Sequence, residues 1–204
     1  MRKLYLDIET LPAPDDKHEI LRFLHEKAIE KNKKAKKDFE QYLLKTSFNG
    51  AFGRILCIGY AVDDMETEVI YEGGDETKML EKFWKIADKS DLFIGHNVMD
   101  FDLRFIYQRS IINKVKPSRD LSFARYRKFP IYDTMREWTN WSFDASVGLE
   151  PIALALGIPT PKDGIDGSQV FDFYKAGKID EILEYCKRDV DTTRAVYKRM
   201  IFEE

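Results

Sequence analysis

Two kinds of hydrophobic pattern alternate along the chain. Short, nearly continuous apolar runs predict buried strands, and longer segments with apolar residues at every third or fourth position predict amphipathic helices. Strands are predicted at 3–7, 54–62, 68–71, 91–96 and 131–132. Helices are predicted at 77–89, from the end of the fourth strand through Phe105 and Ile112, and at 148–156, 168–174 and 179–200. Strands that come early, followed by alternating and then trailing helices, predict an α/β sandwich around one mixed sheet.

Residues 15–46 break this order. They are helix-like and highly charged, and their apolar stripe is intermittent, so we expect an exposed, charged helical insertion at about 15–46. The segment contains a basic run at 31–37, which is typical of a solvated helix face; guiding nucleic-acid phosphates is the alternative role. No repeat, low-complexity segment or domain boundary interrupts the sequence elsewhere, so residues 1–204 are expected to form a single domain.

Composition narrows the class of protein. The 204 residues are 44% hydrophobic and carry a formal net charge of −3, so any basic surface must be local. Cys57 and Cys186 are too few for a disulfide framework or a metal cluster, and we interpret them as reduced core thiols. Charge at Asp7 breaks the apolar start of the chain, and no run approaches the roughly 20 apolar residues of a membrane span. We expect a soluble, cytoplasmic protein with no membrane partner.

Carboxylates in three distant segments carry the chemical signal. Asp7 and Glu9 are two residues apart on the first strand, so both point to the same face while Ile8 points to the other. An edge strand with a solvated acidic face is the alternative interpretation. A short apolar first strand is usually central, however, and two acids buried on one of its faces need a compensating cation.

The other two segments place acids on predicted helices. Asp100 and Asp102 begin a helix, where either could serve as a cap; they differ by about 200° around the axis, so only one can face a given site. Tyr185 and Asp189 are spaced i and i+4 and share one edge of the helix at 179–200. A simple contact at the rim of the helix is the alternative for this pair.

Convergence of these acids would create a specific chemical problem. Asp7, Glu9 and Asp189, together with Asp102, would repel one another strongly unless cations sat between them. Two hard divalent ions solve that problem, and a pair of such ions is suited to cleaving phosphodiesters.

The three segments also match a known set of motifs. Asp7-Ile8-Glu9 matches Asp-x-Glu, Asn97 with Phe101 and Asp102 matches Asn-x-x-x-Phe-Asp, and Tyr185 with Asp189 matches Tyr-x-x-x-Asp. In this order they resemble the DEDD (DnaQ-like) superfamily of 3′–5′ exonucleases. More narrowly, the chain resembles the proofreading exonuclease domain of family B DNA polymerases, as a stand-alone protein. The position before the tyrosine is Glu184 and not histidine, which favours the tyrosine (DEDDy) branch. The second motif selects Asp102 over Asp100.

The resemblance implies a fold, a reaction and a set of roles. The fold would be ribonuclease H-like, with a mixed central sheet flanked by helices. The reaction would be hydrolysis of 3′-terminal phosphodiesters, releasing nucleoside 5′-monophosphates, with two Mg²⁺ or Mn²⁺ ions as cofactors. Tyr185 would orient the attacking water. The metal ligands would be Asp7, Glu9, Asp102 and Asp189, and the substrate-binding residues would be Thr10, Asn97 and Phe101.

The same resemblance implies the partner. We expect nucleic acid with a free 3′ end, single-stranded DNA being favoured over RNA; replication or repair proteins would be further partners, although no motif identifies one. A catalytically silent nucleic-acid-binding module and a ribonuclease H-like endonuclease are the alternatives.

Several other residues have two interpretations each. A lone histidine at a strand end, His96, is more typical of a structural role than a catalytic one. Asp133 follows a predicted strand and either caps the next helix or supports the metal site. The run Arg125-Tyr126-Arg127-Lys128 is typical of a solvated loop, with backbone contact and base stacking as the alternative. Residues 162–167 are interpreted as a connection, because their glycines lack a phosphate-loop arrangement.

Overall fold

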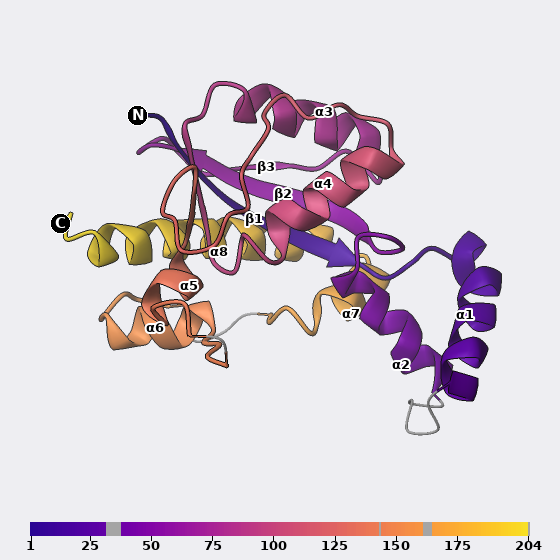
Figure 1. Cartoon of the computed structure of the whole chain (residues 1–204). Helices are drawn as coiled ribbons and strands as arrows, with labels where there is room; N and C mark the ends of the chain where they lie inside the picture. The colour runs from indigo at the N-terminus through magenta and orange to yellow at the C-terminus, as the bar shows by residue number, and fades with distance from the viewer. Residues whose placement is uncertain (32–37, 143, 161–164, 204) are drawn as a thin grey trace.

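A five-stranded mixed sheet forms the centre of the molecule (Figure 1). The structure is a computed structural model, and it describes residues 1–31, 38–142, 144–160 and 165–203. The strands are β1 (Lys3–Leu11), β2 (Arg54–Val62), β3 (Glu68–Ile70), β4 (Leu92–Gly95) and β5 (Ile131–Asp133), in the spatial order β3-β2-β1-β4-β5. The β3-β2-β1 half is antiparallel, and β1, β4 and β5 are parallel. The predicted α/β class with one mixed sheet is confirmed.

Helices cover both faces of this sheet (Figure 1). They are α1 (His18–Lys31), α2 (Phe39–Leu44), α3 (Glu76–Ala87), α4 (Asp102–Ile112), α5 (Thr134–Trp138), α6 (Leu149–Ala155), α7 (Val170–Lys175) and α8 (Ile179–Met200), with 3-10 turns η1 (Asp15–Lys17) and η2 (Lys45–Phe48). The bounds of α8 and β2 are those predicted. Among the described helices, none is both long and apolar enough to cross a membrane.

The first strand is longer than predicted. β1 continues past Asp7 to Leu11, because β2 pairs with it from Leu4 up to the Leu11–Arg54 position. A register shift between Glu9 and Thr10 interrupts the ladder near its end. Since β2 lies on one side of β1 and β4 on the other, the edge-strand interpretation is wrong.

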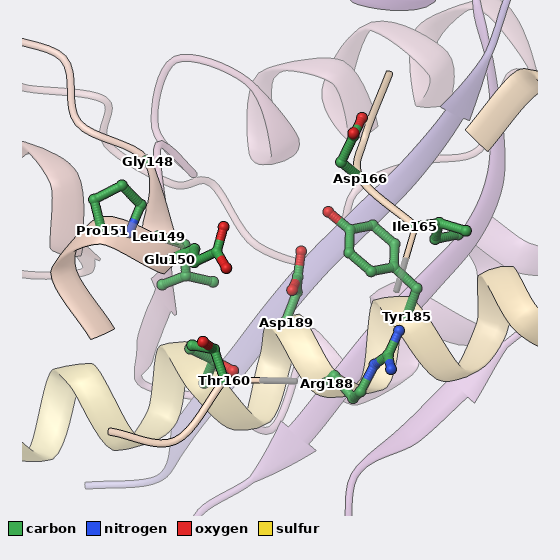
Figure 2. Close-up of a pocket in the computed structure, with 11 residues that line it drawn as sticks. Gly148, Leu149, Glu150, Pro151, Thr160, Ile165, Asp166, Tyr185, Arg188 and Asp189 are labelled. Atoms are coloured by element: carbon green, nitrogen blue, oxygen red, sulfur yellow. The ribbon is translucent and has the colours of Figure 1, made fainter. Parts of the chain in front are cut away.

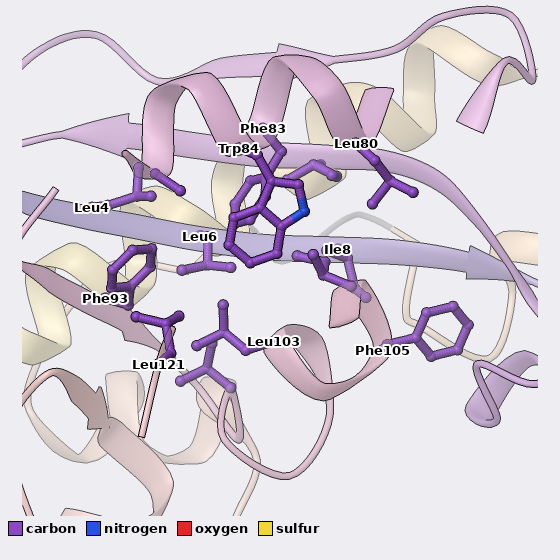
Figure 3. Packing of buried hydrophobic residues seen from close by; sticks show 14 of the residues in the cluster. Leu4, Leu6, Ile8, Leu80, Phe83, Trp84, Phe93, Leu103, Phe105 and Leu121 are labelled. Atoms are coloured by element: carbon purple, nitrogen blue, oxygen red, sulfur yellow. The ribbon is translucent and has the colours of Figure 1, made fainter. Parts of the chain in front are cut away.

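One face of β1 belongs to the main hydrophobic core (Figure 3). Leu4, Leu6 and Ile8 are buried on this face. They belong to one cluster with residues of α3 and α4, including Phe83, Trp84, Leu103 and Phe105. The alternation of a strand then sends the side chains of Asp7 and Glu9 to the opposite face.

The opposite face is covered by α8. Tyr5 and Ile94 pack there in a cluster with Val190 and Tyr197 of α8. At Gly59 of β2, an added Cβ would lie 2.8 Å from the Cys186 sulfur and 3.0 Å from a Val190 methyl carbon. Glycine therefore allows α8 to approach the sheet closely at the level of Asp7, its partner across the ladder.

The predicted charged helical segment contains α1 and α2 (Figure 1). Its end is fixed to β1 and to the residues just after that strand: the Thr10 hydroxyl donates to the Ser47 carbonyl (2.8 Å), and the Ala13 amide donates to the Thr46 hydroxyl (2.8 Å). Most of the basic run at 31–37 lies outside the described residues. That this segment is an insertion in a single domain stays a prediction.

Candidate active site

The two acids of β1 lie beneath α8. Glu9 is buried and Asp7 is partly buried. One carboxylate oxygen of each lies within 4.8 Å of the other and of the Cys186 sulfur, and that sulfur is 3.7 Å from Asp7 Oδ2. Burial raises the pKa of Asp7 well above its ordinary value, and the charges of Asp102, Glu9 and Asp189 raise this pKa further. These two carboxyl groups therefore resist holding full negative charge together.

A third acid reaches the same place from α4. Asp102 is the first residue of that helix and is only 3% exposed. Its Oδ1 accepts a hydrogen bond from the Ile8 amide at 3.0 Å, which joins the start of α4 to the strand residue between Asp7 and Glu9. Burial raises the pKa of Asp102 to about 7, although backbone hydrogen bonds oppose the shift.

The neighbouring acid, Asp100, faces elsewhere. It pairs with Arg136 of α5 and, at 3.3 Å, with Arg104 of α4. The position before Asp102 is the helix cap and forms no side-chain capping bond. Asp102, selected over Asp100 from the motif, is thus the acid that joins the cluster, and neither acid caps the helix.

Asp133 holds the loop that leads to Asp102. Its buried carboxylate accepts hydrogen bonds from the amides of Asn97 (3.0 Å) and Met99 (3.0 Å), and also from the amides of Met135 and Arg136 (3.1 Å each). The last two bonds confirm that Asp133 caps α5, and the first two fix the loop after β4. Asn97 has a left-handed backbone (φ 58°) in that loop.

The third motif contributes from α8. Tyr185 and Asp189 lie one turn apart, and both line the same pocket. Burial raises the pKa of Asp189 to about 6; the nearby Tyr185 hydroxyl and the charge of Arg188 act in the opposite direction. Burial, reinforced by the charge of Asp189, raises the pKa of Tyr185 far above its ordinary value, so the phenol keeps its proton.

These side chains form one cluster. Asp102 bonds to the Ile8 amide between Asp7 and Glu9, and the Cys186 sulfur of α8, about one turn before Asp189, lies 3.7 Å from Asp7 Oδ2. The charges of Asp189 and Asp102 also raise the pKa of both Asp7 and Glu9. The expected convergence of residues from β1, α4 and α8 is therefore present. The role of each residue stays a prediction.

A pocket of about 490 Å³ opens beside the cluster (Figure 2). Figure 2 shows the carboxylate of Asp189 and the hydroxyl of Tyr185 projecting from α8 toward its interior. Glu150 of α6, Thr160 and Arg188 of α8 belong to the same lining. The volume is in the range of pockets that hold small molecules, roughly 300–1,000 Å³.

The donor set fits hard divalent cations. Four carboxylates offer only oxygen ligands, which Mg²⁺ and Mn²⁺ prefer. Their raised pKa values reflect burial first and mutual repulsion second, and bound cations would offset both. The Cys186 thiol is a soft ligand, and its hydrogen bond with Cys57, together with burial, raises its pKa well above the ordinary value, so it keeps its proton. Both thiols are free and buried, as expected.

The residues expected to bind substrate make contacts within the protein. The Thr10 hydroxyl is already hydrogen-bonded to Ser47. Asn97 supports the loop through its carbonyl, which accepts from the Phe101 amide at 3.0 Å. The Phe101 ring is partly buried and lies 6.3 Å from the ring of Phe48, which is 71% exposed. Phe48 was missed because it lies between the first and second motifs and outside the apolar strand pattern.

His96 and the run at 125–128 agree with their structural interpretations. The His96 ring bonds to the Thr134 hydroxyl (2.9 Å) and the Val147 carbonyl (2.8 Å), and burial lowers its pKa. Residues 125–128 form an exposed loop. In the segment 162–167, residues 162–164 lie outside the described part of the chain, and Asp166 is exposed.

Arg188 and Glu150 are pocket residues that sequence reasoning missed. Arg188 follows Tyr185 by three residues, so helical spacing alone placed it on the same edge of α8. No motif signal marked it. Glu150 comes from a different helix, and only the packing of α6 on α8 brings it to the pocket.

Comparison with known proteins places these features in a family. Residues 51–204 match a family described as a predicted 3′–5′ exonuclease related to the exonuclease domain of PolB. This match begins after β1, so Asp7 and Glu9 precede it. No curated protein matches the chain.

A solved structure supports the same fold. The chain resembles the family B DNA polymerase of the hyperthermophilic archaeon Pyrobaculum calidifontis, with a TM-score of 0.66 and 17% identity over 98% of the chain. The chain spans 24% of that polymerase. At this identity the likeness establishes the fold alone, and it agrees with the ribonuclease H-like architecture that was expected.

Proposed function

The chain belongs to the family of predicted 3′–5′ exonucleases related to the exonuclease domain of PolB, and we propose that it removes nucleotides from the 3′ end of nucleic acid. The reaction is metal-dependent hydrolysis of the terminal phosphodiester, which releases a nucleoside 5′-monophosphate. Single-stranded DNA is the favoured substrate.

The carboxylate cluster carries this proposal. Three elements that are distant in sequence each bring acid to one point, where burial and mutual repulsion raise the pKa values. Such an arrangement is costly for stability alone, because buried charges of one sign are not compensated by the fold. It is useful where divalent cations and a phosphodiester must meet.

The metal ligands follow from the cluster. Asp7, Glu9, Asp102 and Asp189 would hold two Mg²⁺ or Mn²⁺ ions. When bound, the ions would supply an activated water and stabilise the charge on the attacking and leaving oxygens. Two hydrogen bonds position these ligands. The Ile8 amide donates to Asp102, and the Met99 amide donates to Asp133, which holds the loop before Asp102.

Tyr185 positions the attacking water. Its hydroxyl keeps its proton because the pKa is raised, so it acts as a hydrogen-bonding group and not as a base. Figure 2 shows this hydroxyl directed toward the pocket that Asp189 also lines. Removing the hydroxyl should therefore slow the chemical step more than it weakens substrate binding.

The terminal nucleotide is held from two sides. The pocket beside Asp189 is large enough for a small ligand. Phe101, with the exposed ring of Phe48 near it, offers an aromatic surface on which a base can stack. Thr10 and Asn97 act on the substrate indirectly, through the backbone they hold.

End-labelled substrates test the proposal. Single-stranded DNA and RNA oligonucleotides of one sequence, labelled at the 5′ or the 3′ end, are incubated with Mg²⁺, Mn²⁺ or EDTA. We expect the 5′ label to report a ladder that shortens one nucleotide at a time, and the 3′ label to appear at once as mononucleotide. EDTA should stop both.

Two outcomes would contradict the proposal. Cleavage of a circular single strand, which has no end, would indicate an endonuclease. Tight binding of linear strands without hydrolysis under any metal would indicate a silent binding module.

A further inference from the structure

One stripe of α8 faces the pocket. Tyr185, Arg188, Asp189 and Thr192 recur at the spacing of successive helical turns, and all four line the cavity. Two members of this stripe belong to the motif that defines the family resemblance. Arg188 is the basic member, and neither the sequence comparison nor the motif gives it a role.

Arg188 differs from its basic neighbours on the helix in its pairing. Lys187 pairs with Glu184 at 3.0 Å, and Arg194 pairs with Asp191 at 2.6 Å. Among the described residues, Arg188 makes no ion pair or hydrogen bond. Its side chain lines the same pocket as Asp189.

The charge balance of the site needs a cation here. Four carboxylates and two divalent ions cancel, and Glu150 and Asp166 add negative charge at the pocket wall. A phosphodiester brings further negative charge, and the monophosphate product brings more. Arg188 is the basic side chain in the described pocket lining, and a planar guanidinium matches two phosphate oxygens at once.

We infer that Arg188 binds the phosphate of the 3′-terminal nucleotide in this pocket, both as the scissile phosphodiester and as the released 5′-monophosphate. The identity of this ligand rests on the proposed exonuclease function. Arg188 is then a substrate-positioning residue that also sets the affinity for product. Arg188 does not take part in the chemical step, which depends on the metal ligands and Tyr185.

Product binding tests the inference without turnover. The dissociation constants of thymidine 5′-monophosphate and of thymidine are measured by calorimetry with Mg²⁺ present, for the parent, Arg188→Gln and Arg188→Lys. Arg188→Gln should weaken binding of the monophosphate by roughly 10- to 100-fold, which is the range for a hydrogen bond to a charged group, and should leave binding of thymidine unchanged. Arg188→Lys keeps the charge but loses the planar pair of donors, so its affinity for the monophosphate should lie between those of the parent and Arg188→Gln.

Arg199→Gln is the matched control. Arg199 lies on the same helix, is exposed in its last turn and is remote from the pocket lining. It should bind both ligands like the parent. Thermal unfolding midpoints close to that of the parent will show that the variants are folded. If Arg188→Gln is destabilised, Arg188→Lys replaces it in the comparison, because lysine keeps the apolar stem of the side chain.

Kinetics on a DNA strand give the second readout. Arg188→Gln should raise KM and the inhibition constant of the monophosphate more than it lowers kcat. Equal weakening of thymidine and its monophosphate, or unchanged affinity for both, would overturn the inference. A parent that binds the monophosphate through Arg188 but never shortens DNA would instead overturn the exonuclease proposal and keep a nucleotide-phosphate site.

Discussion

The two faces of β1 bury opposite kinds of side chain. Leu4, Leu6 and Ile8 point into the main core, where each is almost completely shielded from water. Asp7 and Glu9 point to the other side, under α8, and their pKa values are raised by burial and by neighbouring acids. The two faces therefore have opposite effects on stability: the apolar face stabilises the fold, and the acidic face imposes a cost that bound cations would offset.

The largest expected effect comes from breaking the acidic face. Asp7→Asn removes a ligand for the ions, and loss of several kcal/mol of transition-state stabilisation should lower kcat/KM by about 10³-fold or more. The same change removes charge repulsion, so the metal-free variant should unfold at a higher temperature than the metal-free parent. Exonuclease assays and thermal unfolding in EDTA measure the two effects.

Asp191→Asn is the control for that experiment. Asp191 is an exposed acid of α8 that bonds Thr67 and Arg194, away from the cluster. It should retain activity. If Asp7→Asn kept most of the parent's metal-dependent activity, Asp7 would not be a ligand.

Breaking the apolar face should do the reverse. Leu6→Ala leaves a cavity in a fully buried position and should lower the free energy of unfolding by about 2–5 kcal/mol. Urea denaturation with and without Mg²⁺ measures this loss. The folded fraction should still cleave DNA at close to the parental kcat, since no ligand is changed. A large loss of kcat without loss of stability would mean that the two faces of β1 are not separable.

Asp133 holds the loop that leads to Asp102, and a substitution there tests whether this loop positions the acidic cluster. Both its carboxylate oxygens accept backbone amides, so Asp133→Asn leaves at least one amide without an acceptor. We expect metal affinity and activity to fall by roughly 10- to 100-fold, as for other residues that orient metal ligands. Titration with Mn²⁺ measures the affinity. Parental affinity in a folded Asp133→Asn protein would show that the loop does not position Asp102.

Tyr185→Phe should give a smaller effect. The variant loses one hydrogen-bonding group, which is worth about 0.5–1.5 kcal/mol, and kcat should fall by up to roughly 10-fold. KM should change little, because the ring and its packing remain. Single-turnover measurements separate the chemical step from binding. Equal single-turnover rates for the variant and the parent would remove the role of the hydroxyl.

The smallest effect concerns pH and stability. Without metal, the pKa values of Asp102 (about 7) and Asp189 (about 6) are raised from an unfolded value of 3.8. Their protonated forms are favoured by the fold, so this stabilisation is complete below about pH 4 and is lost as pH rises through about 6 and 7. Metal-free protein should therefore become less stable on going from about pH 5 to about pH 8.

Mg²⁺ should reverse this trend. Protons and cations compete for the same oxygens, so Mg²⁺ should raise the unfolding temperature by on the order of 5 °C at the higher pH and by much less at the lower. Scans with EDTA and with Mg²⁺ at both pH values measure the shifts. An equal Mg²⁺ effect at both would place the cation away from these carboxyl groups.

The contrast between the faces also shows what sequence could predict. The apolar face follows from alternation, and the bounds of α8 and β2 follow from strong local periodicity. The end of β1 was misplaced because its last residues are held by pairing with β2, which is a tertiary contact. The choice of Asp102 over Asp100 needed the motif, since both acids begin the same helix in the sequence.

Other parts of the site depended on tertiary packing. Asp133 follows a strand, and this position predicted that it caps α5. The same position did not predict that Asp133 also accepts hydrogen bonds from two amides of the loop after β4. Glu150 reaches the pocket only because α6 packs on α8. Arg188 lies on a predictable edge of α8, but its lack of an ion-pair partner among the described residues is a property of the assembled fold.

Binding of Mn²⁺ tests the central claim most directly. Electron paramagnetic resonance of free Mn²⁺, titrated into the metal-free protein near neutral pH, gives the number and affinity of sites for the parent and for Asp189→Asn. We predict two sites in the parent and the loss or marked weakening of at least one in the variant. A parent that binds no Mn²⁺, or a variant that binds it as the parent does, would contradict a shared site built from β1, α4 and α8.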